Sequence, residues 1–470
     1  MNKKFYITAA IPYVNAKPHI GHVLEYVQVD VVKRYHRLLG EDSVSLSGGD
    51  ENALKNVQAA EKADQPIQQF VDENTESFRQ MAIKINGEFT YWQKGSDQKT
   101  HFPSSQDLWN LCKKDIYKKS YTGLYCVGCE TFYTPDELNE KGECFEHQGK
   151  KLDEVHEENY FFKLSAYQEK LIKLIETDEL KIIPDFRKNE TLSFLKSGLQ
   201  DISISRSNER AKNWGVPVPN DPKQRIYVWF DALNIYRSGA PEKYWPADVH
   251  AIGKGISRFH CVYWPAFLLS AGLPLPKTIF IHGYLTVNGQ KISKSNPASV
   301  IDPVPLIEKY GADALRYFLL AKISPFNDGD FSEEKLIEVY NADLANGLGN
   351  LVSRVAKLAE SANVAIDNIE KPKEIYRPIQ EKTLSEFRFD EVLSNIWTTD
   401  ISPINKHIDQ NQPWLIKDQE KLKEVLLEEI KDIRIVAYKL LPFIPASAEK
   451  ILKQFSGQIR SGDPLFPRIK

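Results

Sequence analysis

The stretch from Phe5 to His22, FYITAAIPYVNAKPHIGH, decides the fold. Residues 5–10 form an apolar run typical of a buried strand, and a turn rich in proline and asparagine follows it. From His19 to Gly40 apolar side chains recur at helical spacing, at Leu24, Val27, Val31, Tyr35 and Leu38. A strand, a loop and a helix in this order open a βαβ unit.

Strands and helices continue to alternate beyond this unit. Val44 and Leu46 alternate with polar neighbours and predict a second strand, which ends at Gly48-Gly49-Asp50. Further elements are expected as strands at 225–230, 249–252 and 278–281 and as a helix at 256–271 closed by Gly272. The series predicts an α/β fold with a Rossmann-type, doubly wound parallel sheet, whose carboxyl edge is the candidate site.

The pattern changes at two places. A cysteine-bearing segment interrupts it between about Tyr117 and Trp214, and beyond Ser332 long amphipathic helices of an all-α bundle take over. Asn288-Gly289 predicts a tight hairpin before Lys291. The expected division is a first half of the sheet domain at 1–116, an inserted subdomain at 117–214, a second half at 215–331 and a helical bundle at 332–470.

Composition is that of an ordinary globular protein. The 470 residues carry a formal net charge of −3, so any nucleic-acid partner has to be argued from local sites. No apolar run approaches the roughly 20 residues that span a bilayer, which argues against a membrane role. Pro12 interrupts the short apolar N-terminus, so we interpret it as mature protein and not as a signal peptide.

Three of the five cysteines lie between Cys126 and Cys144. Cys126-Val-Gly-Cys129 and Cys144-Phe-Glu-His147 present three thiols and one imidazole in two close pairs. This spacing predicts a tetrahedral Zn²⁺ site in a reducing compartment, for which the cytoplasm is the natural expectation. Four protein ligands leave no open position for catalysis, so one structural zinc per chain is expected.

Two distant motifs suggest a phosphate site, although no G-x-x-x-x-G-K-[ST] loop is present. His19 and His22 stand at a predicted helix start, which favours anions, and Gly21 lets a flat adenine ring approach the backbone. Lys291 and Lys294 could close on a departing pyrophosphate. Taken singly, each motif also has an alternative interpretation without a function. The histidines could be surface residues at a helix start, and the lysines could belong to a solvated turn.

Together and in this order, the two motifs resemble the HIGH and KMSKS signatures of class I aminoacyl-tRNA synthetases, with Ile292 where methionine is usual. The resemblance implies ATP with Mg²⁺, an aminoacyl-adenylate and pyrophosphate as first products, and catalytic roles for both histidines and both lysines. The implied ATP contacts are His19, Gly21, His22, Lys291, Ile292, Ser293 and Lys294.

Three blocks narrow the resemblance to the methionyl-tRNA synthetase family, namely AIPYVNA at 10–16, YVWFDAL at 227–233, and GKGI at 253–256 with Phe259-His260 and Trp264-Pro265. The insert is too short for the large editing domains of the leucine, isoleucine and valine enzymes. By resemblance, Asp50 binds the substrate ammonium group, and a methionine pocket is lined by Ile11, Tyr13, Trp229, Ala232, Leu233, Tyr236, Ile256 and His260. Aromatic walls suit a polarizable thioether, although single aromatics are as well explained as core residues.

The chain departs from the family pattern at two positions. Asn52 lies in GDENA at 49–53, where T-D-E-H-G or a related run is common. Gly255 stands where an aspartate is expected near the ATP ribose. Weaker ATP binding is therefore expected.

The helical end resembles the anticodon-reading region of the same family. Asn350 and Arg354 lie one helical turn apart and can bond base edges, while Trp414 can stack on a base. A polar helix face and a capping Pro-Trp are the alternative interpretation. The implied partners are tRNA(Met), including the initiator, with L-methionine and ATP. No appended tRNA-binding domain follows Pro467, so a monomer is expected.

The resulting hypothesis is a methionine–tRNA ligase that forms methionyl-adenylate and transfers the methionyl group to the 3′ end of tRNA(Met). A ligase for a small acceptor would lack the helical domain. A non-catalytic paralogue would show decayed motifs, for which Asn52 and Gly255 are the only support.

Overall fold

The computed structural model describes residues 3–129, 131–133, 135–144, 149, 151–287, 289–291, 300–366 and 371–469. The chain forms two compact units. Unit 1 comprises Met1–Pro18, Leu39–Gln80 and Glu88–His282, and unit 2 comprises His19–Leu38, Met81–Gly87 and Gly283–Lys470. The expected division into four segments remains a prediction.

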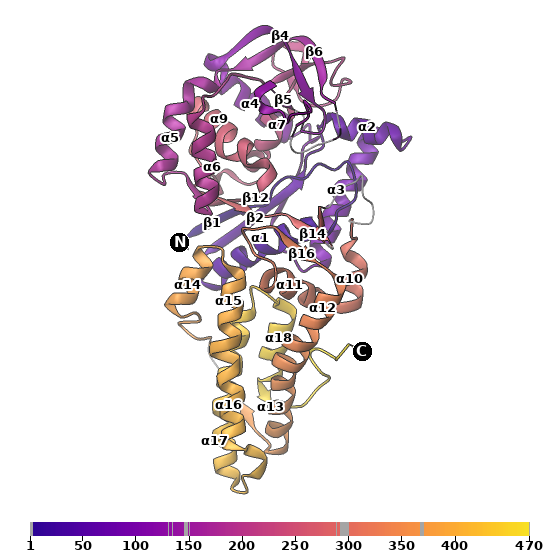
Figure 1. Ribbon diagram of the computed structural model, residues 1–470. Helices are drawn as coiled ribbons and strands as arrows, with labels where there is room; N and C mark the ends of the chain where they lie inside the picture. The colour runs from indigo at the N-terminus through magenta and orange to yellow at the C-terminus, as the bar shows by residue number, and fades with distance from the viewer. Residues whose placement is uncertain are drawn as a thin grey trace. The chain divides into compact units, whose positions relative to one another are not determined.

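The parallel sheet predicted from the sequence is confirmed in unit 1. Its order among the described residues is β3-β2-β1-β12-β13-β7, and every neighbouring pair is parallel. The strands are β1 Lys4–Thr8, β2 Asp42–Gly49, β3 Tyr91–Lys94, β7 Lys181–Ile183, β12 Val249–Gly253 and β13 Thr278–His282. Figure 1 shows β1, β2 and β12 side by side. Strand β7 was not expected, because it comes from the cysteine-bearing segment and is only three residues long.

One predicted strand is wrong. Residues 225–230 were expected to be extended, but β11 (Asp221–Ile226) ends at Ile226 and helix α7 (Val228–Leu233) follows. Strand β11 pairs with β10 (Pro217–Val218) and β9 (Ser205–Ser207) in a small antiparallel sheet. All six residues of α7 are buried. A short apolar run that is buried on every side has no periodicity to separate strand from helix.

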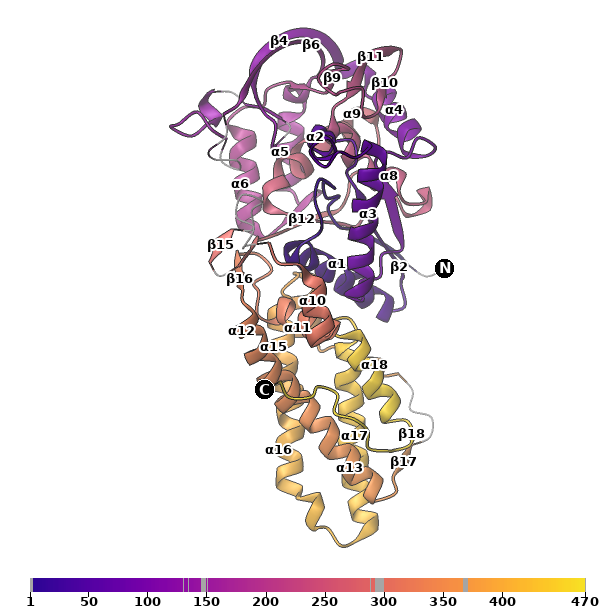
Figure 2. The same ribbon diagram turned by 90° about the vertical axis from the view of Figure 1, so that its right-hand side faces the viewer.

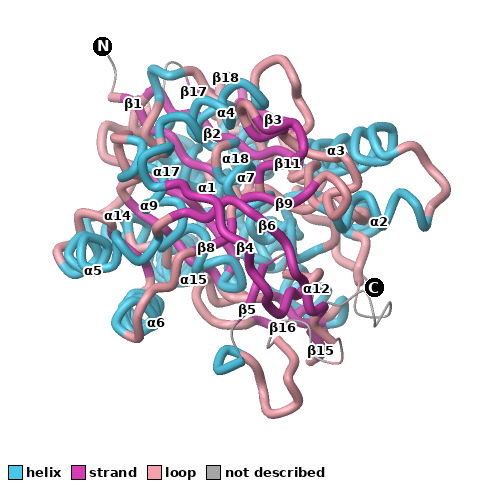
Figure 3. Tube along the Cα trace, turned by 90° about the horizontal axis from the view of Figure 1, so that it is seen from above, coloured by secondary structure: helices cyan, strands magenta, loops and turns pink. Residues whose placement is uncertain are grey.

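The cysteine-bearing segment forms an antiparallel sheet of order β5-β4-β6-β8. The strands are β4 Ile116–Cys126, β5 Thr131–Tyr133, β6 Asp153–Phe162 and β8 Ile202–Ser203. Figure 3 shows β4 and β6 running side by side, with Ile116 opposite Phe162 and Tyr125 opposite Asp153. The helices of unit 1 are α2 Leu54–Lys62, α3 Ile67–Lys84 (whose last turn belongs to unit 2), α4 His101–Leu111, α5 Gln168–Glu176, α6 Asp185–Lys196, α7, α8 Ile235–Ser238 and α9 Trp264–Ala271.

Unit 2 begins with α1 (Ile20–Leu38), the helix predicted from the opening stretch. Its small sheet has the order β15-β14-β16, and the antiparallel pairing of Val287 with Gln290 confirms the predicted hairpin. These strands are β14 Leu285–Val287, β15 Gln290–Lys291 and β16 Gly329–Phe331. A short ribbon joins β17 Ala365–Ile366 to β18 Gly457–Gln458.

Long helices dominate the rest of unit 2, as predicted. They are α10 Pro303–Tyr310, α11 Ala312–Ala321, α12 Glu333–Val339, α13 Asn350–Ser361, α14 Pro378–Ser385, α15 Phe389–Ile396, α16 Ser402–Asn411, α17 Gln419–Leu440 and α18 Pro445–Gln454. A π-helical segment, Tyr340–Gly349, joins α12 to α13. Helix α17 packs against α13, α16 and α18 (Figure 2). Among the described residues, no helix is both long and apolar enough to cross a membrane.

A buried ion pair ties α1 to this helical region. The Asp30 carboxylate lies 2.6 Å from the guanidinium of Arg316, and both side chains are almost fully buried. Arg316 also donates to the carbonyl oxygens of Pro442 and Phe443. Removing one partner of such a pair leaves an uncompensated buried charge and costs about 3–5 kcal/mol.

Candidate functional site

The predicted methionine pocket converges on Trp229 in α7. The ring of Tyr13 meets it edge-on with centroids 5.9 Å apart, and His260 lies at 6.3 Å with a similar edge contact. Phe259 stacks on Trp229 at 3.7 Å and fixes its plane. The indole N–H of Trp229 points to the carbonyl oxygen of Cys129, 3.4 Å away. Aromatic side chains from three separate segments therefore form one wall.

Asp50 lies at the end of β2, at the carboxyl edge of the sheet, as predicted. Its backbone N–H donates to the carbonyl of Pro12 at 2.9 Å, and Asp50 pairs with Tyr13 in an isolated parallel bridge. The side-chain amide of Asn56 donates to the Asp50 carbonyl at 2.7 Å. Asp50 is buried, so its carboxylate can act as a low-dielectric anchor for a substrate cation.

His260 is held neutral at the pocket. Its Nδ1 lies 3.0 Å from the carbonyl oxygen of Ile256, and its Nε2 lies 2.7 Å from the hydroxyl of Tyr236. A carbonyl only accepts, so Nδ1 carries the proton and Nε2 accepts from Tyr236. Burial lowers the pKa of His260 to about 4, against a weaker opposing effect of the bond to Ile256. The pocket wall therefore presents an uncharged imidazole at physiological pH.

The other predicted pocket residues belong to the same region. Ala232 and Leu233 follow Trp229 in α7 and are buried. Ile11 and Ile256 are partly buried and pack against the apolar cluster that contains Trp229, Leu233 and Tyr236. Six of the nine predicted residues thus belong to or pack against one apolar cluster of unit 1, namely Ile11, Tyr13, Trp229, Leu233, Tyr236 and Ile256.

A buried polar network behind α7 was not anticipated from the sequence. One oxygen of Asp231 accepts from His101 Nε2 and from the Ser105 hydroxyl, each at 2.8 Å, and the other accepts from the Asn52 amide at 2.6 Å. Ser238 lies 2.7 Å from the other ring nitrogen of His101. Asp231 and His101 are 130 positions apart, so no local pattern predicts that they meet. The available indication in the sequence was that each is a polar residue close to apolar neighbours.

The cysteines that were predicted as metal ligands come together. The sulfur of Cys144 lies 3.3 Å from that of Cys126 and 3.8 Å from that of Cys129, and all three sulfurs lie within 4.8 Å of one another. Tetrahedral zinc with bonds of about 2.3 Å separates thiolate sulfurs by roughly 3.8 Å, so the three thiols fit a zinc ion. The fourth predicted ligand, His147, lies outside the described residues. All five cysteines are free of disulfides.

His19, Gly21 and His22 stand at the start of α1 in unit 2. The backbone N–H of Gly21 donates to Nδ1 of His19 at 3.2 Å, and the backbone N–H of His19 donates to Nδ1 of His22 at 3.1 Å. Both Nδ1 atoms accept a hydrogen bond, so in each neutral ring the proton lies on Nε2. An Nε2–H group of this kind can donate to a phosphate oxygen. The two ring centroids are 3.9 Å apart.

The lysine motif is only partly described. Lys291 lies in β15, where its backbone pairs with Thr286. Ile292, Ser293 and Lys294 lie outside the described residues.

The predicted anticodon residues lie in the helical part of unit 2. Arg354 in α13 donates to Asp409 at 2.9 Å and to Asn405 at 3.2 Å, both in α16. Asn350, one turn earlier, is exposed. Trp414 follows α16 in a 3₁₀ turn and is 51% exposed, which is unusual for a tryptophan. An exposed indole can stack on an unpaired base, and a partly exposed guanidinium can bond a base edge.

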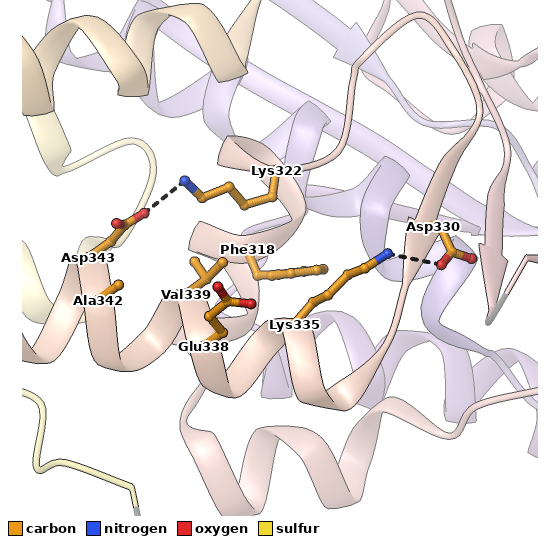
Figure 4. A pocket seen from close by; sticks show the side chains of 8 residues that line it. All are labelled: Phe318, Lys322, Asp330, Lys335, Glu338, Val339, Ala342 and Asp343. Atoms are coloured by element: carbon orange, nitrogen blue, oxygen red, sulfur yellow. Dashed lines mark hydrogen bonds and ion pairs between the residues drawn. The ribbon is translucent and has the colours of Figure 1, made fainter.

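A surface hollow of about 490 Å³ also lies in unit 2, between α11, β16 and the helix that follows (Figure 4). Its lysines are engaged, because Lys322 pairs with Asp343 at 2.9 Å and Lys335 with Asp330 at 3.3 Å. None of the described residues that line it belongs to the sequence-predicted site.

Comparisons with known proteins identify the family of this chain. A family model described as class I tRNA synthetases (M) matches residues 5–356. The methionine–tRNA ligase of Brucella suis is 40% identical, covering 96% of this chain and 91% of that protein, and that of Thermotoga maritima is 39% identical, covering 96% and 75%.

Solved structures give the same result. Mycobacterium tuberculosis methionyl-tRNA synthetase in complex with methionyl-adenylate superposes with a TM-score of 0.90 at 35% identity, covering 99% of this chain and all of that one. Its apo form gives 0.81 at 32% identity, covering 100% and 99%. Matches of this extent show that the chain belongs to the methionine–tRNA ligase family of class I aminoacyl-tRNA synthetases.

Proposed function

We propose that this protein activates L-methionine with ATP and transfers the methionyl group to the 3′ end of tRNA(Met), the initiator included. The observation that carries the proposal is the meeting of Asp50 with the Tyr13–Trp229–His260 wall at the carboxyl edge of the sheet. A buried carboxylate answers the ammonium group of an amino acid, and apolar aromatic walls suit a thioether side chain.

Different pocket residues recognise different parts of the methionine molecule. Asp50 binds the ammonium group, while Tyr13, Trp229 and neutral His260 enclose the side chain. The remaining lining comes from Ile11, Ala232, Leu233, Tyr236 and Ile256. Because His260 donates to Ile256 and accepts from Tyr236, it offers the thioether no unpaired charge. Such a pocket favours methionine over a polar amino acid of similar length.

In the activation step a methionine carboxylate oxygen attacks the α-phosphorus of ATP, and pyrophosphate leaves. The Nε2–H donors of His19 and His22 and the ammonium groups of Lys291 and Lys294 stabilise the charge on phosphate oxygens. Gly21, Ile292 and Ser293 complete the proposed ATP contacts, and Mg²⁺ accompanies the nucleotide. In the transfer step the terminal ribose 2′-hydroxyl attacks the methionyl carbonyl, and AMP leaves.

The knuckle, defined as Cys126, Cys129, Cys144 and His147, holds one structural Zn²⁺ in this proposal. The sulfur separations support it. Thiolate ligands require a reducing compartment, so the cytoplasm is the proposed location.

Recognition of the tRNA is assigned to Asn350, Arg354 and Trp414. The exposure of Asn350 and Trp414 and the partial exposure of Arg354 support this role. The working form is proposed to be a monomer.

Methionine-dependent exchange of pyrophosphate into ATP tests the activation step, and methionylation of a tRNA(Met) transcript tests the transfer step. Exchange that depends on another amino acid would refute the methionine assignment. Exchange without transfer would instead favour a ligase with a different acceptor.

A further inference from the structure

The side chain of Asn52 connects two walls of the pocket. Its backbone is two residues beyond Asp50, in the turn between β2 and α2. Its amide nitrogen donates to the carbonyl oxygen of Gly95 at 2.7 Å and to a carboxylate oxygen of Asp231 at 2.6 Å. Both partners only accept, so the amide orientation is fixed by chemistry and both of its N–H groups are used.

Asp231 carries this contact to the aromatic wall. It lies in α7, two positions after Trp229 and directly before Ala232. Its second oxygen is fastened to α4 through His101 and Ser105. The Asp231 carboxylate is therefore held from two sides, by α4 at one oxygen and by Asn52 at the other, and Asn52 belongs to the segment that carries Asp50.

Close packing makes this connection stiff. A Cβ atom added at Gly95 would lie 3.1 Å from both the Gly49 carbonyl oxygen and the Glu51 N–H, so the two backbones are in tight contact. Both carboxylate oxygens of Glu51 are also bonded, one to Thr75 and the other to Ser96. A shift at Asn52 would be transmitted to Asp50, because few voids can absorb it.

We infer that Asn52 is a positioning residue that sets the distance between the Asp50 carboxylate and the Trp229 wall, and thereby the affinity for the amino acid substrate. Its amide hydrogen atoms are bonded to Gly95 and Asp231, so it acts through them, and the inference rests on the proposed function of this pocket. Neither the Asn52 amide nor the Gly95 carbonyl carries a titratable proton, so this end of the connection is held by neutral hydrogen-bonding groups.

The first test compares Asn52→Ala with Ser105→Ala. Each variant removes hydrogen bonds to Asp231, but only the first cuts the connection to the Asp50 segment. The KM for methionine in pyrophosphate exchange should rise about tenfold in Asn52→Ala, equivalent to about 1.4 kcal/mol, with the KM for ATP within about twofold of wild type. Ser105→Ala should raise the KM for methionine less than about threefold. Equal effects of the two variants, or equal changes in both KM values, would overturn the inference.

The second test exchanges the partners. Asn52→Asp alone places two carboxylates within hydrogen-bond distance, and such a pair shares one proton, so the KM for methionine should rise and become dependent on pH. In the Asn52→Asp/Asp231→Asn double variant the bond between positions 52 and 231 is re-formed with reversed polarity, and the new amide oxygen still accepts from His101 and Ser105, while the bond to the Gly95 carbonyl stays lost. The double variant should therefore bind methionine more tightly than Asn52→Asp, although more weakly than wild type, and should regain the wild-type pH profile. Failure to recover either would count against the connection.

Equilibrium binding of methionine, followed by tryptophan fluorescence or calorimetry, separates the two proposals. A wild-type protein that binds methionine without exchanging pyrophosphate refutes the proposed activation, and the Asn52 comparison is then decided by the dissociation constants. A wild-type protein that does not bind methionine refutes both.

Discussion

The indole N–H of Trp229 lies 3.4 Å from the carbonyl oxygen of Cys129, so a wall of the methionine pocket rests on the backbone of the knuckle. A second contact runs parallel to it. The ammonium group of Lys55 lies 3.1 Å from the carbonyl of Gly128 and 2.9 Å from the ring centroid of Tyr13. The backbone at Gly128 and Cys129 thus contacts Trp229 directly and Tyr13 through Lys55.

Loss of the metal should therefore weaken the binding of the amino acid substrate. We expect one zinc per chain by elemental analysis, and we expect chelation to raise the KM for methionine about tenfold, a typical effect of disturbing groups next to a metal site. The KM for ATP should change less. Lys55→Met is a useful companion, because it removes the contact to Gly128 without altering a ligand. A metal-free protein with unchanged methionine affinity would contradict the proposed coupling.

Tyr236→Phe should weaken methionine binding without unfolding the protein. The substitution removes the donor to His260 Nε2 and leaves a buried acceptor unsatisfied, which costs about 1–3 kcal/mol. The expected result is a KM for methionine raised about tenfold or more and a lower unfolding temperature. Tyr263→Phe, a buried tyrosine on the next turn after His260, is the matched control. Similar effects of both substitutions would show general core damage instead of a pocket role.

The pH dependence of His260 has a defined direction. Its pKa is lowered to about 4 by burial, below the ordinary value of about 6.5, so the unfolded chain binds the proton more readily. The stability that comes from the neutral ring is complete above about pH 6.5 and is lost as the pH falls towards 4. In carbon-13 histidine spectra the resonance that disappears in His260→Gln should not titrate between pH 8 and 5.5. Titration near pH 6.5 would contradict the buried, Nδ1-protonated ring.

Gly255→Asp should improve ATP binding. Gly255 lies in the 3₁₀ turn that follows β12, at the position where the family places an aspartate near the ribose. An added carboxylate that bonds a ribose hydroxyl is expected to lower the KM for ATP about threefold to tenfold, the range of one charge-assisted hydrogen bond. Gly239→Asp is an unsuitable control, because a Cβ there would clash with Leu46. Gly462→Asp, in open space, is suitable. An unchanged KM would show that the ribose is held otherwise.

Arg354→Ala should separate the two reaction steps. Pyrophosphate exchange needs no tRNA and should be unaffected, whereas the KM for tRNA(Met) in methionylation should rise at least about tenfold if the guanidinium bonds a base. Asp409→Asn retains the side-chain size and weakens only the existing pair with Arg354. It should therefore leave tRNA affinity near that of wild type or increase it. Equal loss in both variants would point to a structural role of the pair.

Local sequence patterns correctly predicted the helices and strands that show a clear hydrophobic periodicity or a strong turn signal. Helix α1, the hairpin at Gly289 and the central strands agree with the sequence because each is set by near neighbours. Helix α7 was missed because its apolar run is buried on every side. Strand β7 was missed because three residues carry too little pattern.

The parts of the candidate site that depend on residues close together in the sequence were also easier to predict than those that depend on distant residues. The cysteine spacing is local and indicated a metal site directly, whereas the pocket residues were found through family resemblance. The Asn52–Asp231 bond joins positions 179 apart, so no local signal announces it. Sequence comparison alone treated Asn52 as a departure from the family pattern, and its partners became visible only in three dimensions.

The buried pair of Asp30 and Arg316 bears on how this enzyme family can be re-engineered. Helix α1 carries the histidine motif, and its anchor Arg316 also holds the turn at Pro442 and Phe443. A graft that exchanges the C-terminal helices between relatives must therefore keep the shape of that turn. Otherwise the guanidinium loses the Pro442 and Phe443 acceptors, and the anchor of α1, with the histidine motif at its start, is weakened.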